Sequence, residues 1–382
     1  MRALEKLDFG GKKLGFGFMR LPLLEGGKDM DVDLEKTFAM VDRFMEAGFC
    51  YFDTAHGYHE GASEKVLKQA LVDRYPRESY LIADKLTHDH FQTEADIRPL
   101  IDQELDLVGV SYFDFFLMHS MTQNRYEKYK ACRAYEVAAE LKREGKIRHI
   151  GISFHDKPEL LRRILTEQPE VEFVQIQLNY VDYEDGGVQS RANYEVCCEF
   201  GKPVVVMEPV KGGLLANLPE AAGKILDELG GGSYPSYAIR FAASHENVAV
   251  VLSGMSTLQQ VEDNLSFMAD FKPLDERERT ALDRVCGILK EEDLIPCTAC
   301  RYCVEGCPKK IAIPDLFACM NAKKRYQDWS SDFYYEVSTE GDRGKASDCI
   351  TCRNCEGVCP QHLPITTLLR DVAAAFEKES EK

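Results

Sequence analysis

The sequence predicts an α/β protein: a (β/α)8 (TIM) barrel over residues 1–291, followed by a smaller, partly helical, cysteine-rich domain over residues 292–382. Strand-like apolar runs alternate with amphipathic stretches through the first 290 residues. Nine of the 14 cysteines then lie after residue 296, and eight of these nine form two copies of one motif. The chain of 382 residues is long enough for one large domain and an appendage, because a typical domain spans roughly 100–200 residues.

Eight short runs rich in apolar, β-branched or aromatic residues are the predicted strands. They are Leu14–Phe18, Phe49–Phe52, Tyr80–Ala83, Phe113–Met118, Ile147–Ile152, Phe173–Ile176, Val204–Met207 and Val248–Leu252. Stretches with helical spacing lie between them, such as Leu34–Ala47, Ile97–Leu107 and Tyr135–Arg143, and Leu258–Phe267 follows the last run. This alternation implies parallel strand pairing. Eight such units over about 270 residues fit a barrel, whose usual size is about 250 residues.

An open, doubly wound sheet is the alternative fold. Such a sheet usually carries a glycine-rich phosphate turn after its first strand. Here the first run contains Gly15 and Gly17, but the third glycine of the dinucleotide fingerprint is missing. The barrel is therefore the favoured fold.

The C-terminal cysteines form an internal duplication with an offset of 52 residues. The two motifs, each followed by a proline, are Cys297, Cys300, Cys303 and Cys307, and then Cys349, Cys352, Cys355 and Cys359. Three closely spaced thiolates on a loop can bind three irons of one cubane. Structural zinc prefers two separated pairs of ligands, so it suits this spacing poorly. The motifs predict two [4Fe–4S] clusters.

This region, about residues 292–372, resembles the two-cluster ferredoxin-type domains. The resemblance implies that the fourth cysteine of each motif binds the cluster held by the other motif. The segment between the motifs is long, so a more helical relative of the small ferredoxins is expected.

Polar side chains follow several predicted strands of the barrel. They are Asp53, Lys85, His119 and Ser153, and Tyr58 lies in the loop after the second strand. The C-terminal ends of the strands build the active site of such barrels. An acid, a lysine, a histidine and a tyrosine are therefore expected at one mouth.

These positions resemble the catalytic tetrad of the aldo/keto reductase family, in order and context, and the likeness covers about residues 5–290. The resemblance implies carbonyl reduction by a nicotinamide, with Tyr58 as general acid. Lys85 would lower the pKa of Tyr58, Asp53 would hold Lys85, and His119 would orient the carbonyl oxygen.

The resemblance also implies nine cofactor contacts. They are Ser153 and Gln175 at the nicotinamide amide, Met207 where an aromatic residue usually stacks, Ser253, Gly254, Met255 and Gln260 near the phosphates, and Asp263 and Asn264 at the adenine end. Gly254 and Gln260 stand where the family usually has the Lys and Arg that bind the 2′-phosphate. The choice between NADH and NADPH therefore stays open.

The leading prediction is an NAD(P)H-dependent reductase of a small carbonyl compound that carries two [4Fe–4S] clusters for electron transfer or structure. The alternative is an iron–sulfur electron-transfer subunit whose barrel is a docking scaffold without nicotinamide turnover. A zinc-stapled interaction domain is a third interpretation. A redox partner protein of the ferredoxin or flavodoxin type fits the first two.

The net charge and the hydropathy of the sequence exclude some classes of binding partner. A net charge of −17 argues against nucleic acid and anionic membranes. No apolar run approaches the roughly 18 residues of a membrane-spanning helix, so a cytoplasmic protein is expected. His56 and His59 flank Tyr58 and are expected to line the substrate mouth; metal binding is not expected there, because no third ligand has usable spacing.

Overall fold

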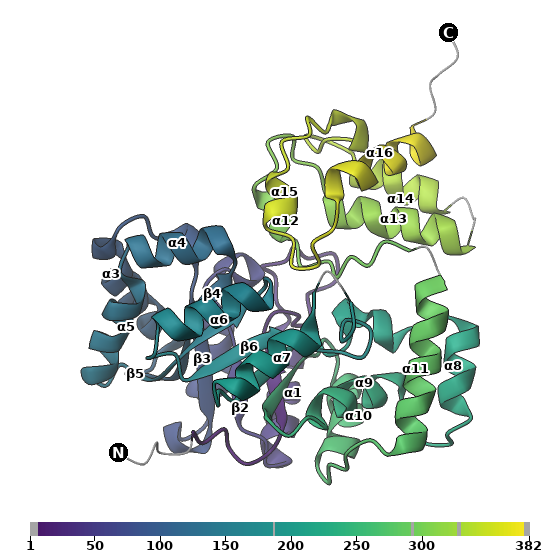
Figure 1. Cartoon of the computed structure of the whole chain (residues 1–382). Helices are drawn as coiled ribbons and strands as arrows, with labels where there is room; N and C mark the ends of the chain where they lie inside the picture. The colour runs from purple at the N-terminus through teal and green to yellow at the C-terminus, as the bar shows by residue number, and fades with distance from the viewer. Residues whose placement is uncertain (1–6, 186–187, 292–293, 327–329, 378–382) are drawn as a thin grey trace.

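The computed structural model describes residues 7–185, 188–291, 294–326 and 330–377. Two bodies are visible in Figure 1: a barrel surrounded by helices, and a smaller helical module that contains the C-terminus. Eight parallel strands close the barrel in chain order, from β1 to β8, and β1 pairs with β8. The (β/α)8 barrel is thus confirmed.

The strands are short and almost entirely buried. Their bounds are β1 (Leu14–Gly17), β2 (Tyr51–Asp53), β3 (Leu81–Leu86), β4 (Phe113–Met121), β5 (Ile147–Phe154), β6 (Phe173–Gln177), β7 (Val204–Met207) and β8 (Val248–Gly254). All eight predicted runs overlap a strand. Six strands end later than predicted, among them β3, β4 and β5, so Lys85, His119 and Ser153 lie inside these three strands rather than after them.

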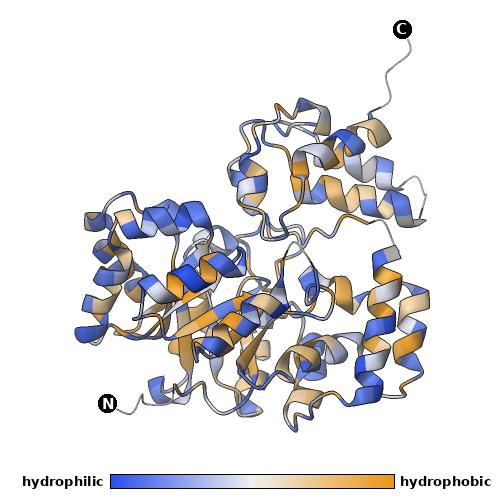
Figure 2. Ribbon diagram, viewed as in Figure 1, coloured by the Kyte–Doolittle hydropathy of each residue, from blue (hydrophilic) through white to orange (hydrophobic). Residues whose placement is uncertain are grey.

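Helices cover the outside of the barrel. They are α1 (Leu34–Glu46), α2 (Ser63–Leu67), α3 (Glu94–Val108), α4 (Gln123–Ala131), α5 (Ala134–Arg143), α6 (Pro158–Glu167), α7 (Ser190–Glu199), α8 (Glu220–Asp227), α9 (Tyr234–Ala243), α10 (Leu258–Met268) and α11 (Glu276–Glu291). Short 3-10 or π turns join them, among them η1 (Tyr58–Gly61), η2 (Lys68–Val72), η4 (His88–His90) and η5 (Lys211–Ala216). Figure 2 shows apolar strands and helices whose outer faces are polar.

Alternation along β3 explains how one strand serves two environments. Ala83 packs in the apolar interior of the barrel, whereas Ile82 and Leu86 pack outward, against the helices. Because successive side chains of a strand point to opposite faces, Lys85 shares the inner face with Ala83, and Asp84 faces the helices. Both polar side chains are buried, so neither has bulk water to solvate it.

A bulge in β4 positions the histidine of the site. The register between β4 and β5 shifts between Met118 and Met121, and Ser120 has a φ of 60°. A bulge inserts an extra residue into a strand and turns the neighbouring side chains. The irregularity falls at His119 and Ser120, at the C-terminal end of the barrel.

The module has its own hydrophobic core, built from residues between Ile295 and Val372. Its helices are α12 (Tyr302–Glu305), α13 (Ile313–Tyr326), α14 (Ser330–Ser338), α15 (Asn354–Gly357) and α16 (Ile365–Phe376). The prediction of a partly helical domain agrees with this layout. The predicted boundary between residues 291 and 292 stays a prediction, since residues 292 and 293 lie outside the described residues.

Candidate active site

The four predicted catalytic side chains meet at the mouth of the barrel. The Nζ atom of Lys85 lies 2.6 Å from Oδ1 of Asp53 and 3.3 Å from the hydroxyl of Tyr58. It also donates to the carbonyl oxygen of Thr54 at 2.5 Å. Lys85 is 1% and Asp53 4% exposed, so this ion pair is buried. The structure thus joins a carboxylate, an ammonium and a phenol in one chain of contacts.

The surroundings of Tyr58 keep its hydroxyl protonated. Burial, and then the negative charges of Asp53, Asp84 and Glu208, raise the pKa of Tyr58 well above its usual value. A hydrogen bond with the hydroxyl of Tyr302 lowers the pKa of Tyr58 in part. The resemblance implied that Lys85 lowers the pKa of Tyr58; burial and three carboxyl groups act in the opposite direction here. The surroundings of Tyr58 therefore favour the protonated phenol.

His119 is a neutral imidazole beside Tyr58. Its ring lies edge-on to the Tyr58 ring, with centroids 5.9 Å apart. Burial, followed by the charges of Lys85 and Arg125, lowers the pKa of His119 well below its usual value. Its Nδ1 atom is 2.9 Å from the hydroxyl oxygen of Thr87. When Thr87 donates this bond, the ring proton lies on Nε2, where it can be donated to a carbonyl oxygen.

A cavity of about 360 Å³ opens at the C-terminal ends of the strands, and Asp53 and Tyr58 line it. Its size is within the usual range of small-molecule sites. Eight of the predicted cofactor residues line it: Gln175, Met207, Ser253, Gly254, Met255, Gln260, Asp263 and Asn264. The ninth, Ser153, is buried, and its hydroxyl accepts a hydrogen bond from the backbone N–H of Ser120 at 2.6 Å.

The cavity offers the groups that a dinucleotide needs. The Nε2 atom of Gln175 donates to Asp53 at 3.4 Å, while its Oε1 atom is buried without a hydrogen-bond partner among the described residues. A carboxamide N–H can satisfy such an oxygen. At the other end, α10 begins after Thr257, close to Gly254 and Gln260, and a helix N-terminus favours a phosphate. Arg20 is the one Lys or Arg among the described lining residues.

The two histidines that flank Tyr58 do not line this cavity, contrary to expectation. His59 points into the barrel wall, where its Nε2 atom accepts from the N–H of Leu21 at 3.1 Å. The Nδ1 atom of His56 lies 2.9 Å from Oε2 of Glu64. Both imidazole rings therefore have their partners outside the cavity.

The eight motif cysteines line two small cavities inside the module. The cavity nearer the barrel is lined by Cys297, Cys300, Cys303 and Cys359. The other is lined by Cys307, Cys349, Cys352 and Cys355. Each cavity thus combines three thiols of one motif with the fourth thiol of the other motif. All eight thiols are free.

The chemistry of these thiols fits a metal cluster. Burial raises the pKa of Cys297 to about 11 and that of Cys300 to about 12, and the neighbouring thiols add to both effects. Four such thiols in one buried cavity can become thiolates together only when a cation offsets their charge. The apolar walls, such as Ile313 and Phe317, exclude water from the first cavity.

The module forms one side of the barrel cavity. Thr298, Cys300, Tyr302 and Pro360 all belong to the module, yet they line the same cavity as Tyr58. Cys300 also lines the first cysteine cavity, so one thiol borders both spaces. The Tyr302 ring lies edge-on to His119, with centroids 6.4 Å apart.

Three further contacts bind the module to the barrel. A guanidinium N–H of Arg20 donates to the carbonyl oxygen of Thr298 at 2.9 Å. The buried Lys211 pairs with Asp182 and donates to Oε1 of Gln361 at 2.7 Å. The backbone of η5 lies directly against the backbone at Thr298, since an added Cβ at Gly212 would be 2.6 Å from that carbonyl oxygen.

The fold and the site define an oxidoreductase of the barrel type with an attached iron–sulfur domain. Residues 13–286 match the aldo/keto reductase family, and the chain belongs to this family. Residues 296–363 match a 4Fe-4S dicluster domain. The resemblance found in the sequence is thus confirmed for both parts.

Several known proteins are similar to the chain. L-galactose dehydrogenase of Arabidopsis thaliana is 24% identical over 311 residues, which cover 76% of this chain and 94% of that protein. NADH-specific methylglyoxal reductase of Escherichia coli is 24% identical over 289 residues, 63% of this chain and 86% of that protein. The holo form of aldo-keto reductase AKR11C1 from Bacillus halodurans has a TM-score of 0.59 and 26% identity, and covers 72% of this chain and 91% of its own.

Sequence reasoning did not place the module residues in the active site. Thr298 and Tyr302 lie inside the first cysteine motif, where the motif itself explains their presence. The described residues include no helix that is long and apolar enough to cross a bilayer.

Proposed function

We propose that the chain reduces the carbonyl group of a small aldehyde or ketone at the expense of NADH or NADPH, with Tyr58 as the proton donor. The observation that carries this proposal is the position of the Lys85 ammonium between Asp53 and the Tyr58 hydroxyl, two side chains that line a cavity with the groups a dinucleotide needs. Relatives named as a dehydrogenase and as an NADH-specific reductase support it.

Bound NAD(P)H would supply a hydride to the carbonyl carbon. As negative charge develops on the carbonyl oxygen, Tyr58 gives it the proton of its hydroxyl. The Lys85 ammonium, 3.3 Å away, stabilises the phenolate that results. Nε2–H of His119 holds the carbonyl oxygen, and the orphan Oε1 atom of Gln175 accepts from the nicotinamide carboxamide.

The cofactor contacts are part of this proposal. Ser253 and Asn264 are joined by a 2.8 Å hydrogen bond, and Asp263 accepts from Ser233 at 2.5 Å, so the adenine end of the cavity is built from oriented polar groups. Gly254 and Gln260 carry no positive charge, so Arg20 is the cationic side chain of the described cavity lining that can bind a phosphate. Both nicotinamides belong in the assay.

We further propose two [4Fe–4S] clusters with crossed ligation. One would be held by Cys297, Cys300, Cys303 and Cys359, and the other by Cys307, Cys349, Cys352 and Cys355, as the linings of the two cavities suggest. The first cluster would border the cavity of the barrel, through Cys300.

One observation favours a second candidate function, in which the barrel is a docking scaffold and the clusters exchange electrons with a ferredoxin- or flavodoxin-type partner. Cys300 reaches both the cluster cavity and the barrel cavity, which is a short path for single electrons. This function needs no nicotinamide turnover.

The substitution Tyr58→Phe tests the proposal. Removing a general acid costs roughly 10²–10⁴-fold in rate, so oxidation of NADH or NADPH with methylglyoxal as the probe carbonyl should fall by that factor. The visible absorbance of the clusters should not change. Tyr112→Phe, at the opposite end of the barrel just before β4, is the matched control. Turnover in Tyr58→Phe equal to that of the parent enzyme rejects Tyr58 as the donor.

A further inference from the structure

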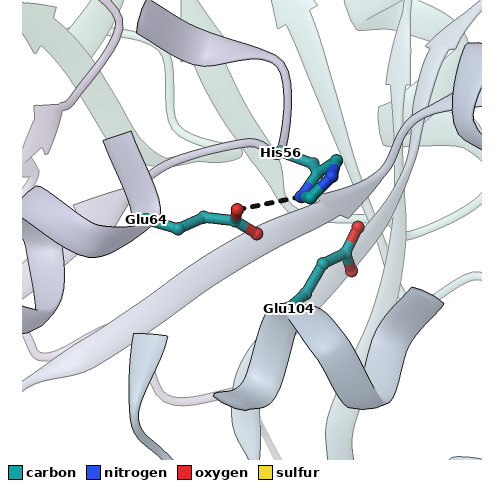
Figure 3. Close-up of side chains that lie close together, drawn as sticks. All are labelled: His56, Glu64 and Glu104. Atoms are coloured by element: carbon teal, nitrogen blue, oxygen red, sulfur yellow. Dashed lines mark hydrogen bonds and ion pairs between the residues drawn. The ribbon is translucent and has the colours of Figure 1, made fainter. Parts of the chain in front are cut away.

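A second group of titratable side chains lies behind the active site, between the barrel and its helices. His56 follows β2, Glu64 lies in α2, Asp84 in β3 and Glu104 in α3. Figure 3 shows the imidazole of His56 and the carboxyl groups of Glu64 and Glu104 converging on one small space. One ligand atom from each of these three residues lies within 4.8 Å of the others.

The three carboxyl groups are fully buried, each with 0% of its residue exposed. Both oxygens of Glu104 lack a hydrogen-bond partner among the described residues, and so do Oε1 of Glu64 and Oδ2 of Asp84. A buried carboxyl group without a donor, an acceptor or a cation is unfavourable, because nothing replaces the water that it has lost. Something must therefore satisfy the Glu104 carboxyl group.

The protein groups around the cluster do not supply that partner. The Oδ1 atom of Asp84 accepts from the N–H of Lys85 at 2.8 Å, and Glu64 contacts Nδ1 of His56 at 2.9 Å. The carboxyl groups of Glu64 and Asp84 lie close enough that the charge of Glu64 raises the pKa of Asp84, after the larger effect of burial. None of these contacts reaches Glu104, which points into the cluster with its whole carboxyl group (Figure 3).

We propose that His56, Glu64 and Glu104, with Asp84 beside them, bind one divalent cation of the Mn²⁺, Fe²⁺ or Zn²⁺ class. Imidazole and carboxylate donors together suit these ions. Bonds of about 2.0–2.2 Å place neighbouring ligand atoms roughly 3 Å apart and opposite ones about 4.3 Å apart. The observed spread from 2.9 Å to within 4.8 Å needs only a small contraction.

The position of this site gives it a consequence for the barrel mouth. His56 lies two residues before Tyr58, and Asp84 directly precedes Lys85. A cation held there would fasten the loop of the tyrosine to the strand of the lysine, and both to α3. His56 keeps part of its side chain exposed, at 13%, which gives the ion a way in. The site stands independently of the proposed carbonyl reduction.

The test uses the whole protein, purified without oxygen and with its cluster absorbance intact, and Mn²⁺ as the probe. Manganese prefers oxygen donors to thiolates, so it should leave the cysteine sites alone. Equilibrium dialysis and the electron paramagnetic resonance of free Mn²⁺ should show one saturable ion per chain. The same ion should raise the melting temperature, since a ligand that binds only the folded state stabilises it.

The diagnostic variant is Glu104→Gln, which keeps the shape of the side chain and removes its charge. It should weaken Mn²⁺ binding at least tenfold and abolish the rise in melting temperature. Asp106→Asn, an exposed position two residues later on α3, is the matched control and should bind as the parent does. If Glu104→Gln loses its clusters, His56→Gln at the more exposed edge serves the same purpose.

Three results overturn the proposal. One is the absence of saturable Mn²⁺ binding by the parent protein. Another is binding by Glu104→Gln as tight as that of the parent, which assigns the ion to the acidic surface. A third is a Glu104→Gln protein that is more stable than the parent at every Mn²⁺ concentration, since that result makes Glu104 a neutral, protonated acid.

Discussion

Two adjacent glycines offer a direct measure of how firmly the module is seated on the barrel. Gly212 and Gly213 both have positive φ angles, of 64° and 98°. A Cβ at Gly212 would lie 2.6 Å from the carbonyl oxygen and 2.9 Å from the Cα atom of Thr298, whereas a Cβ at Gly213 would meet nothing within 4 Å. Alanine at either position carries the backbone cost, but only Gly212→Ala forces the module outward.

The expected loss of stability follows from the backbone cost and the steric overlap. A left-handed alanine costs about 1–2 kcal/mol, and this is the whole effect for Gly213→Ala. Gly212→Ala adds an overpacking cost of about 1–3 kcal/mol, since neither backbone can yield like a flexible side chain. Its total loss in the free energy of unfolding is therefore about 2–5 kcal/mol.

Hydrogen exchange followed by mass spectrometry separates the two variants. Peptides that cover residues 296–303 should exchange faster in Gly212→Ala than in the parent, because the docked loop is lifted. In Gly213→Ala the same peptides should exchange at the parental rate. Equal exchange in both variants would show that the module is not held where the structure places it, and the reasoning about a shared cavity would fail with it.

Two further outcomes concern the module. Tyr302→Phe removes a hydrogen bond that lowers the pKa of Tyr58, so Tyr58 becomes a weaker acid. A neutral hydrogen bond contributes about 0.5–1.5 kcal/mol, so kcat for the carbonyl probe should fall about two- to tenfold. An unchanged kcat would refute the contact between the two tyrosines. Cys307→Ser should damage the cluster bordered by the second motif and leave the other intact, whereas Cys319→Ser, buried in the module core, should leave both. Iron analysis and electron paramagnetic resonance read this out, and loss of the cluster next to the barrel in Cys307→Ser would contradict crossed ligation.

The barrel could be predicted because its strands are apolar runs that need no distant information. The predicted C-terminal ends of the strands were wrong where the polar residues of the site begin. Lys85 and His119 are polar, so hydropathy places them after their strands, but the closed barrel buries them inside β3 and β4. There Lys85 has a carboxylate partner at 2.6 Å. A polar residue inside a barrel strand is satisfied by partners that lie far away in the sequence.

The remaining part of the site depends on contacts that no local pattern contains. Tyr302 reaches Tyr58 across 244 positions of the chain, and it does so from within a cluster motif. Glu64, Asp84 and Glu104 follow one another at intervals of 20 residues, a spacing that matches no ligand motif. Only the folded arrangement of α2, β3 and α3 brings these carboxyl groups together.

Because one side of the barrel cavity is formed by Thr298, Tyr302 and Pro360, the site is complete only while the module keeps its shape. Oxygen degrades exposed [4Fe–4S] clusters, and the loops that bind a cluster would then lose the ligand that holds them in place. An enzyme handled in air would accordingly lose a wall of its pocket without any change in its barrel. Its durability in oxygen would be decided at the cysteines of the module rather than in the barrel.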